Sequence, residues 1–209
     1  MISKKVKSHF YQSIEGFFSF KELYKEQVLK ASNNAHFVEV GVYLGRSASY
    51  MAVEIANSGK DIKFDCVDTW SLWPQSVKEL KMKNIYYKKF TKNMRPVKGY
   101  YNPIQLKSTE AAKMYEDNSL DFIFIDAHHT YDEVLQDITA WYPKVKIGGT
   151  LAGHDYYNDG DLHYTQDGEL YGVVKAVNEY FYNDKLIVND EALTWSIVKN
   201  LDECKQISS

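Results

Sequence analysis

The sequence predicts an α/β protein built as one Rossmann-like domain, with a mostly parallel, doubly wound sheet and helices on both faces. Strand-like and helix-like segments alternate five times along the chain, as parallel strands with crossover helices require. The run from Leu120 to Ile125 is apolar at almost every position, which is typical of a central parallel strand covered on both faces. A short apolar strand ends at Gly41 and a helical pattern begins at Gly45, so a tight glycine turn joins them.

Each element follows from the spacing of its apolar residues, which recur every three or four positions in helices and alternate or run together in strands. The first helix carries Leu23, Val28 and Leu29 on one apolar face. The last two strands are separated by a short polar link, so we expect them to pair as a hairpin and to place an antiparallel strand near the sheet edge. The expected helices are 20–31, 45–58, 75–93, 109–115, 131–141 and 170–182, and the expected strands are 36–40, 61–68, 104–106, 120–125, 150–153, 186–188 and 194–198.

Composition indicates an ordinary globular protein. The 209 residues are 44% hydrophobic and 25% charged, and we expect one domain over residues 1–209, with an N-terminal helical cap (1–34) and a Rossmann-like core (35–200). A net charge of −3 and a pI near 6.1 disfavour nucleic acid and anionic membranes as partners. The sequence shows no secretory or membrane-spanning pattern, and its two cysteines do not make a disulfide scaffold. A cytoplasmic protein is therefore expected.

Acidic or imidazole side chains occupy the carboxyl ends of four predicted strands, where sheets of this kind bind ligands. Glu39 precedes the glycine turn of the first strand, and Asp68 ends the second. Asp126 follows the fourth strand, and His154 and Asp155 follow the fifth. Because the carboxyl ends of parallel strands share one edge of the sheet, we expect these side chains to form one site.

The glycine turn limits the kind of ligand. A dinucleotide needs three spaced glycines so that the backbone can approach its pyrophosphate. Counted from Gly41, the second and third positions hold Tyr43 and Arg46, whose side chains would obstruct a pyrophosphate and so disfavour a dehydrogenase. A nucleoside without phosphates needs only room beside the turn, which Gly41 and Gly45 would provide. Asp68 lies about 23 residues beyond Gly45, near the offset at which a carboxylate takes ribose hydroxyls. S-adenosylmethionine fits these requirements.

Four motifs carry a resemblance to a known family: E-V-G-V-Y-L-G-R-S from Glu39, C-V-D-T-W from Cys66, D-F-I-F-I-D-A-H-H-T-Y from Asp121 and G-G-T-L-A-G-H-D-Y from Gly148. In this order and spacing they resemble the class I S-adenosylmethionine-dependent methyltransferases, over about residues 14–198. The likeness is greatest to the branch of small-molecule and macrolide-sugar O-methyltransferases. It implies a seven-stranded sheet and transfer of a methyl group to a small hydroxylated acceptor, such as a sugar or a sugar-bearing metabolite.

The resemblance also implies cofactor-binding residues. Glu39 and Gly41 would line the methionine end of S-adenosylmethionine, and Ser47 would hydrogen-bond its carboxylate. Asp68 would hold the ribose, and Ser108, after the third strand, would lie beside the adenine. The other residues expected to contact the cofactor belong to the same motifs: Tyr43, Gly45, Thr69, Asp126 (near the sulfonium) and His128.

A metal and a general base are implied in the same way. Related catechol and sugar O-methyltransferases hold magnesium with three acidic residues, one after the fourth strand and two after the fifth. Asp126 and Asp155 match this set, whereas His154 stands where an aspartate is usual. Imidazole suits manganese, iron or zinc better than magnesium, so a divalent cation (magnesium or manganese) is a secondary expectation. Beside Asp126, either His129 or His154 would act as the catalytic base that takes the acceptor's proton.

Simpler interpretations of the same residues stay open. Asp68 can cap a helix, and Ser47 or Ser108 can stabilise a first helical turn. His128 and His129 can satisfy backbone groups where a helix begins. Methylation of nitrogen or carbon without a metal is an alternative function, as is an inactive cofactor-binding subunit. The expected partner is a small-molecule acceptor, and a homo-oligomer is compatible with the sequence.

Overall fold

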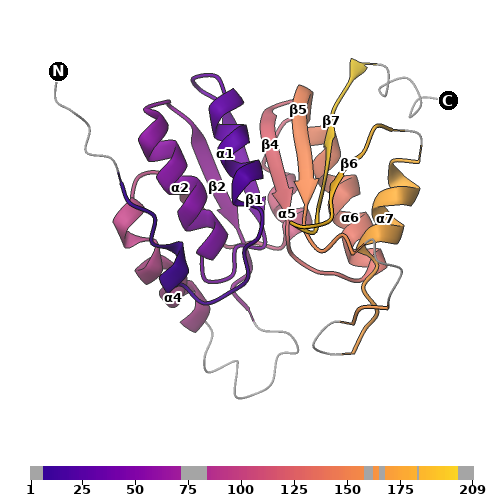
Figure 1. Cartoon of the computed structure of the whole chain (residues 1–209), viewed down its shortest axis with the longest axis horizontal. Helices are drawn as coiled ribbons and strands as arrows, with labels where there is room; N and C mark the ends of the chain where they lie inside the picture. Colours follow the sequence, from indigo (N-terminus) through magenta and orange to yellow (C-terminus); the bar gives the residue numbers. More distant parts are fainter. Residues whose placement is uncertain (1–6, 72–83, 158–161, 165–167, 183, 202–209) are drawn as a thin grey trace.

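The computed structural model describes residues 7–71, 84–157, 162–164, 168–182 and 184–201. Within them, seven strands form one sheet in the order β3-β2-β1-β4-β5-β7-β6 (Figure 1). The strands are β1 His36–Val40, β2 Lys63–Val67, β3 Asn102–Ile104, β4 Leu120–Ile125, β5 Val145–Gly153, β6 Ile187–Asn189 and β7 Thr194–Val198. The helices are α1 Lys21–Lys30, α2 Arg46–Ser58, α4 Ile85–Asn93, α5 Ser108–Ala112, α6 Tyr131–Trp141 and α7 Val173–Tyr180, with 3-10 turns η1 Tyr11–Ser13, η2 Arg95–Val97 and η3 Tyr142–Lys144.

The direction of the strands confirms the predicted Rossmann-like sheet. β1 pairs in parallel with both β2 and β4, and β3 and β5 extend the parallel part on either side. β7 runs antiparallel to both β5 and β6, so the predicted C-terminal hairpin supplies the antiparallel edge. Strand order reverses between β1 and β4. A cleft beyond the ends of these two strands is the expected place for a ligand.

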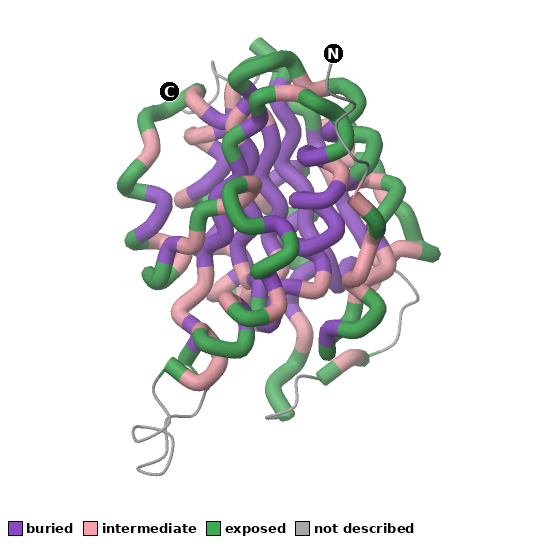
Figure 2. Tube along the Cα trace, turned by 90° about the vertical axis from the view of Figure 1, so that its left-hand side faces the viewer, coloured by how far each residue is buried: buried purple, intermediate pink, exposed green. Residues whose placement is uncertain are grey.

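The sheet separates two apolar clusters, because successive side chains of its central strands point to opposite faces. Phe37 and Phe122 pack on the face covered by α1, α2 and α4. Val38 and Ile123 pack on the face covered by α5, α6 and α7. Figure 2 shows the buried strands in the middle of the molecule and exposed segments on the outside. Both faces of the sheet are therefore covered, which explains the continuous apolar run of β4.

Four strands differ from their predicted bounds: β2 and β6 differ slightly, and β3 and β5 differ more. β3 begins earlier, at Asn102, and includes Pro103, which is tolerated because β3 lies at the edge of the sheet and needs no partner on its outer side. β5 extends from Val145 through Gly148, which adopts a φ of +80°, and its register with β4 shifts between Leu120 and Phe122. A glycine at an irregular point in a strand was mistaken for a turn.

Two of the predicted helices, 75–93 and 20–31, differ in part from the observed helices α4 and α1. The predicted helix 75–93 is observed as α4 from Ile85, and its part before residue 84 lies outside the described residues. In α1, Val28 is buried and Leu23 packs against the core, as predicted, but Leu29 is 68% exposed and Tyr24, which was not predicted, is fully buried. None of the helices in the described residues is long and apolar enough to span a membrane.

Candidate active site

Backbone geometry and close packing both explain why glycine occurs twice in the turn after β1. Gly41 and Gly45 both adopt a φ of +88°, in the left-handed region that favours glycine. A Cβ atom on Gly41 would lie 2.0 Å from the carbonyl oxygen of Asp126, and one on Gly45 would lie 3.0 Å from the Phe90 ring. Protein atoms therefore fill the space that a side chain would take at either glycine. The close approach places the β1 turn directly against the end of β4.

Glu39, the last acidic residue before this turn, is completely buried. Its Oε1 accepts a short hydrogen bond from the Ser47 hydroxyl at the start of α2. Its Oε2 has no aligned hydrogen-bond partner among the described residues, although the Tyr24 hydroxyl of α1 is close enough to affect it. Burial raises the pKa of Glu39 to about 8, against the effect of the Ser47 hydrogen bond. Glu39 Oε2 is therefore a buried acceptor with unused hydrogen-bonding capacity below the turn. The ammonium group of a cofactor would need such an acceptor.

Asp68, at the end of β2, connects two turns. Its Oδ2 accepts the Tyr43 N–H (2.8 Å) and its Oδ1 accepts the Trp70 N–H (2.6 Å). Burial raises the pKa of Asp68, although both N–H groups oppose the rise. Asp68 therefore links the two loops and does not cap a helix, which was its alternative structural interpretation. A carboxylate has about four lone-pair sites, so acceptor capacity remains for ribose hydroxyls.

The residues around Asp68 are tied to the turn after β1 and to one another. Trp70 is 3% exposed and donates its indole N–H to the Tyr43 carbonyl (2.8 Å). Tyr43 itself adopts a φ of +45° and is 43% exposed beside Tyr86. Thr69 accepts a hydrogen bond from the Gln105 side chain at its carbonyl oxygen. Tyr43 and Thr69 therefore lie next to Asp68, as the cofactor prediction requires.

Ser108 has structural partners on α6. Its hydroxyl oxygen accepts the Trp141 indole N–H (2.8 Å), and it hydrogen-bonds the Asp137 carboxyl group. Burial raises the pKa of Asp137 to about 6, and the Ser108 bond opposes this rise. Ser108 thus joins α5 to α6. Because its hydroxyl is used in this way, an adenine ring would contact the Ser108 backbone at the start of α5.

The two adjacent histidines after β4 have different environments. His128 is half exposed, and its Nδ1 lies 3.4 Å from Glu133 in the first turn of α6. Glu133 also accepts the Thr130 hydroxyl (2.8 Å), so His128 belongs to the helix entrance. His129 instead places Nε2 2.8 Å from Asp155 Oδ2, beyond the end of β5.

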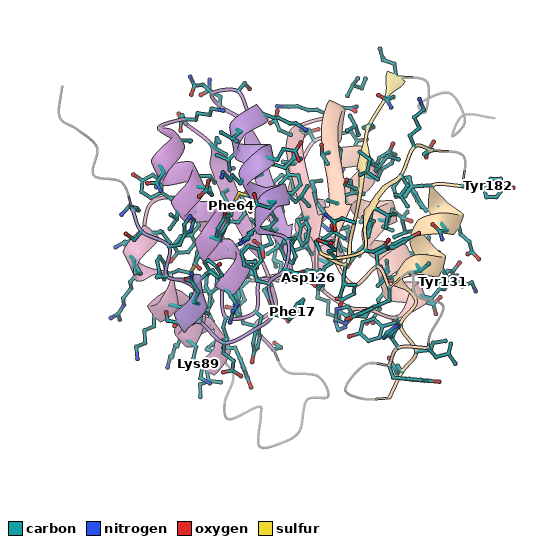
Figure 3. All side chains as sticks on the ribbon, in the orientation of Figure 1. Phe17, Phe64, Lys89, Asp126, Tyr131 and Tyr182 are labelled. Carbon is teal, nitrogen blue, oxygen red and sulfur yellow. The ribbon has the colours of Figure 1, made fainter. Side chains whose placement is uncertain are left out.

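Asp126, His154 and Asp155 converge where β4 and β5 end, and Figure 3 marks the position of Asp126 at this end of the sheet. One ligand atom from each residue lies within 4.8 Å of the others, which is close enough for all three to bind one cation. His154 Nδ1 is 3.2 Å from Asp155 Oδ2 and 3.7 Å from Asp126 Oδ1. Asp155 adopts a φ of +57°, an unusual backbone conformation that turns its side chain into this group.

Opposite charges stabilise one another in this cluster. Burial disfavours a charge on His154, but the nearby Asp126 and Asp155 carboxylates raise its pKa to about 10. Burial likewise opposes ionisation of Asp155, yet His129 and His154 hold its pKa well below the usual range. Burial lowers the pKa of His129, but Asp155 outweighs this effect and the net direction is upward. When protonated, His129 and His154 supply positive charge beside the carboxylates. A divalent cation bound there could supply this charge in their place.

The cluster borders a small hollow that is open to solvent. The wall on one side is formed by Val134, Val173 and Trp195. The donor set of two carboxylates and one imidazole fits manganese, iron or zinc, and fits magnesium less well because of its nitrogen ligand. Two residues that contact the site, the buried Tyr24 near Glu39 and the half-buried Ser19 beside His154, were missed in the sequence. They lie in the N-terminal segment, and no motif connects them to the site.

Residues 38–156, more than half of the chain, match the protein family described as a methyltransferase domain. The chain belongs to this family, and its fold is that of the class I S-adenosylmethionine-dependent methyltransferases. A Sinorhizobium fredii protein, described as the uncharacterized protein y4gI, is 28% identical over 120 residues, which are 56% of this chain. The chain matches only 13% of that protein's length.

Solved structures with very different acceptors share the fold. The O-methyltransferase NovP is 17% identical, with 87% of this chain and 80% of NovP covered and a TM-score of 0.63. The Burkholderia thailandensis 1,6-didemethyltoxoflavin-N1-methyltransferase, which holds S-adenosylhomocysteine, is 11% identical (86% and 76% covered, TM-score 0.53). A Streptococcus thermophilus rRNA methylase is 11% identical (89% and 99% covered, TM-score 0.55). The fold alone therefore does not identify the acceptor.

Proposed function

We propose that this methyltransferase acts on a hydroxyl group of a small acceptor bound where β4 and β5 end. The observation that carries the proposal is the convergence of Asp126, His154 and Asp155 within 4.8 Å, directly beside the β1 turn. Methyl transfer is an in-line displacement, so the acceptor oxygen and the methyl donor must be held next to each other. Contact between Gly41 and Asp126 makes the two predicted binding regions neighbours.

In this proposal the cofactor lies along the ends of β1 and β2. Glu39 and Ser47 would meet its methionine end, since the buried Glu39 Oε2 has unused acceptor capacity. Asp68 would accept ribose hydroxyls with the lone pairs that Tyr43 and Trp70 leave free. Gly41, Gly45, Thr69, Ser108, Asp126 and His128 complete the proposed cofactor-binding set.

Asp126, His154 and Asp155 would hold a divalent cation, which when bound lowers the pKa of a coordinated hydroxyl. The two histidines then have separate roles. The His154 side chain is only 4% exposed and is surrounded by its partners, whereas the His129 side chain is 27% exposed. His129 is therefore the proposed general base, and Asp155 at 2.8 Å would orient it and stabilise its protonated form.

Aromatic rings near the cluster support a sugar or another ring-shaped acceptor. Phe17 is 67% exposed and lies 5.5 Å, between ring centroids, from His154. Tyr171 lies 4.8 Å from His129, and Tyr157 packs against Tyr171. Such rings stack on the apolar faces of sugars and aromatic compounds. The same proposal includes a small-molecule acceptor instead of nucleic acid or a membrane. It also includes a single domain and a cytoplasmic location.

The test is formation of S-adenosylhomocysteine with a panel of sugars and phenols, each paired with the same compound blocked at its hydroxyl. We expect turnover only with free hydroxyls, stimulation by Mn²⁺, and loss of activity in a chelator and in the variant Asp126→Asn. Asp121→Asn is the matched control, because Asp121 lies at the opposite end of β4 and pairs with Lys146. Equal rates in chelator with amine or carbon acceptors would establish the metal-free alternative instead.

A further inference from the structure

We propose that Ser19 is a positioning residue that presents Nδ1 of His154 to the cation site. This inference rests on the proposed function, because it concerns a residue that would hold the cation. Ser19 lies in the segment before α1, and its hydroxyl oxygen is 3.2 Å from His154 Nε2. The same hydroxyl is 2.7 Å from the carbonyl oxygen of Ala192, in the loop between β6 and β7.

Counting hydrogens determines the direction of both bonds. A carbonyl oxygen only accepts, so the single hydroxyl hydrogen of Ser19 is donated to Ala192. The Ser19 oxygen is then left as an acceptor for His154, and Nε2 must carry a hydrogen to bond to it. In a neutral imidazole the other nitrogen is unprotonated. That nitrogen is Nδ1, the atom that faces Asp126 and Asp155 at 3.7 and 3.2 Å.

The surroundings of the ring hold it in this orientation. The Phe20 ring lies 5.1 Å from the His154 ring and the Phe17 ring lies 5.5 Å from it, between centroids. Phe20 is 2% exposed, so it has little freedom to move. A half-turn of the imidazole would exchange both nitrogens for ring carbons and lose the contacts to Ser19 and to the carboxylates. The ring therefore presents a nitrogen lone pair, rather than an N–H group, once it is neutral.

A metal-binding histidine usually donates its second N–H to an acceptor, which fixes the tautomer and strengthens the ligand. Loss of such an acceptor weakens metal binding by about 10- to 100-fold. Imidazole nitrogen contributes more to manganese binding than to magnesium binding. Removal of the Ser19 hydroxyl should therefore weaken Mn²⁺ binding far more than Mg²⁺ binding.

The experiment is titration of the full chain with Mn²⁺ alone, and separately with Mg²⁺ alone, without cofactor or acceptor. We expect Ser19→Ala to bind Mn²⁺ about 10-fold more weakly and Ser19→Thr, which keeps the hydroxyl, to stay within about threefold of the unaltered chain. Ser58→Ala is the matched control, because Ser58 also donates to a carbonyl (Ile55, 2.8 Å) and accepts an N–H (Lys60, 3.1 Å), at the far end of α2. Thermal melting verifies that each variant is folded.

A spectroscopic measurement distinguishes positioning from general structural support. In the Zn²⁺-loaded chain, ¹⁵N NMR should show metal on Nδ1 of His154 and a hydrogen on Nε2. Metal on Nε2, or equal Mn²⁺ affinity in Ser19→Ala and the unaltered chain, would overturn the role of Ser19 while leaving the cation site intact. Failure of the unaltered chain to bind Mn²⁺ or Zn²⁺ would overturn both the cation site and this inference.

Discussion

Two clusters in this sheet pair a buried aspartate with histidine, and they differ in what surrounds the carboxylate. Asp65 of β2 is 1% exposed and accepts hydrogen bonds from His36 (2.7 Å), Tyr115 (2.8 Å) and Asn102 (2.9 Å). Although burial opposes its ionisation, these partners lower the pKa of Asp65. Its donors come from both neighbouring strands and from the segment after α5, so its hydrogen-bonding capacity is used within the protein.

The cluster beyond β4 and β5 contains two carboxylates and leaves one of them poorly bonded. Asp126 Oδ1 lies 3.7 Å from His154 and 4.0 Å from His129, and both distances exceed a hydrogen bond. Asp155 is shared between the two histidines, and the group borders an open hollow. The comparison teaches that the number of unused acceptors, rather than the residue types, separates a candidate site from a structural network.

The largest effect is expected for a substitution in the cluster beyond β4 and β5. Asp155→Asn keeps the shape of the side chain but removes a charge that would hold the cation. Since loss of even an indirect partner of a metal ligand costs about 10- to 100-fold, we expect Mn²⁺ affinity and turnover to fall by more than about 100-fold. Stability should fall less than in the Asp65 variant below, because the histidines can release their protons. Isothermal titration with Mn²⁺ and initial rates measure the effect, and unchanged Mn²⁺ affinity contradicts it.

The closed cluster should respond in the opposite manner. Asp65→Asn removes the charge that faces His36 and places an amide among hydrogen-bond donors. Hydrogen bonds to a buried charged group contribute about 1.5 to 3 kcal/mol, so we expect a loss of about 3 kcal/mol in urea unfolding. Mn²⁺ affinity should stay within about twofold, since Asp65 does not belong to the cation cluster. A variant as stable as the unaltered chain would show that this network is not structural.

Glu39 is an intermediate case and gives the smallest effect. Its folded-state pKa of about 8 lies above the ordinary glutamate pKa of 4.5, so between these pH values the folded chain retains a proton that the unfolded chain has lost. Stability therefore declines as pH rises from about 4.5 to 8 and levels off above that range. Glu39→Gln cannot ionise and should be more stable than the unaltered chain at pH 8, by about 2 kcal/mol after relaxation of the site. Denaturant unfolding at pH 5 and pH 8 tests this, and a parallel pH dependence in both chains would refute it.

The fold was predictable because its strongest patterns are local. β1, β4, β7 and α6 have the predicted bounds, since each is a compact apolar run or a regular amphipathic repeat. The differences arise where tertiary structure overrides local signals. Pro103 is accepted because β3 lies at an edge. Tyr24 is buried because it packs against Phe122 and Phe124 of β4, whereas Leu29 is exposed.

The site was predictable only in part. The rule that ligands bind beyond parallel strand ends identified Asp126, His154 and Asp155, whose proximity follows from strand pairing. It did not separate His128 from His129, because their different partners depend on how the loop enters α6. Ser19 was not predictable, since it is 135 residues away from His154 and belongs to no motif. Contacts of this kind depend on the path of the chain in three dimensions.

The bond from Ser19 to the Ala192 carbonyl has a consequence for the order in which the protein matures. His154 bonds to Ser19, and Ser19 is held in turn by Ala192 in the loop of the β6–β7 hairpin. The imidazole would therefore gain its full set of contacts only once this hairpin has docked on the sheet.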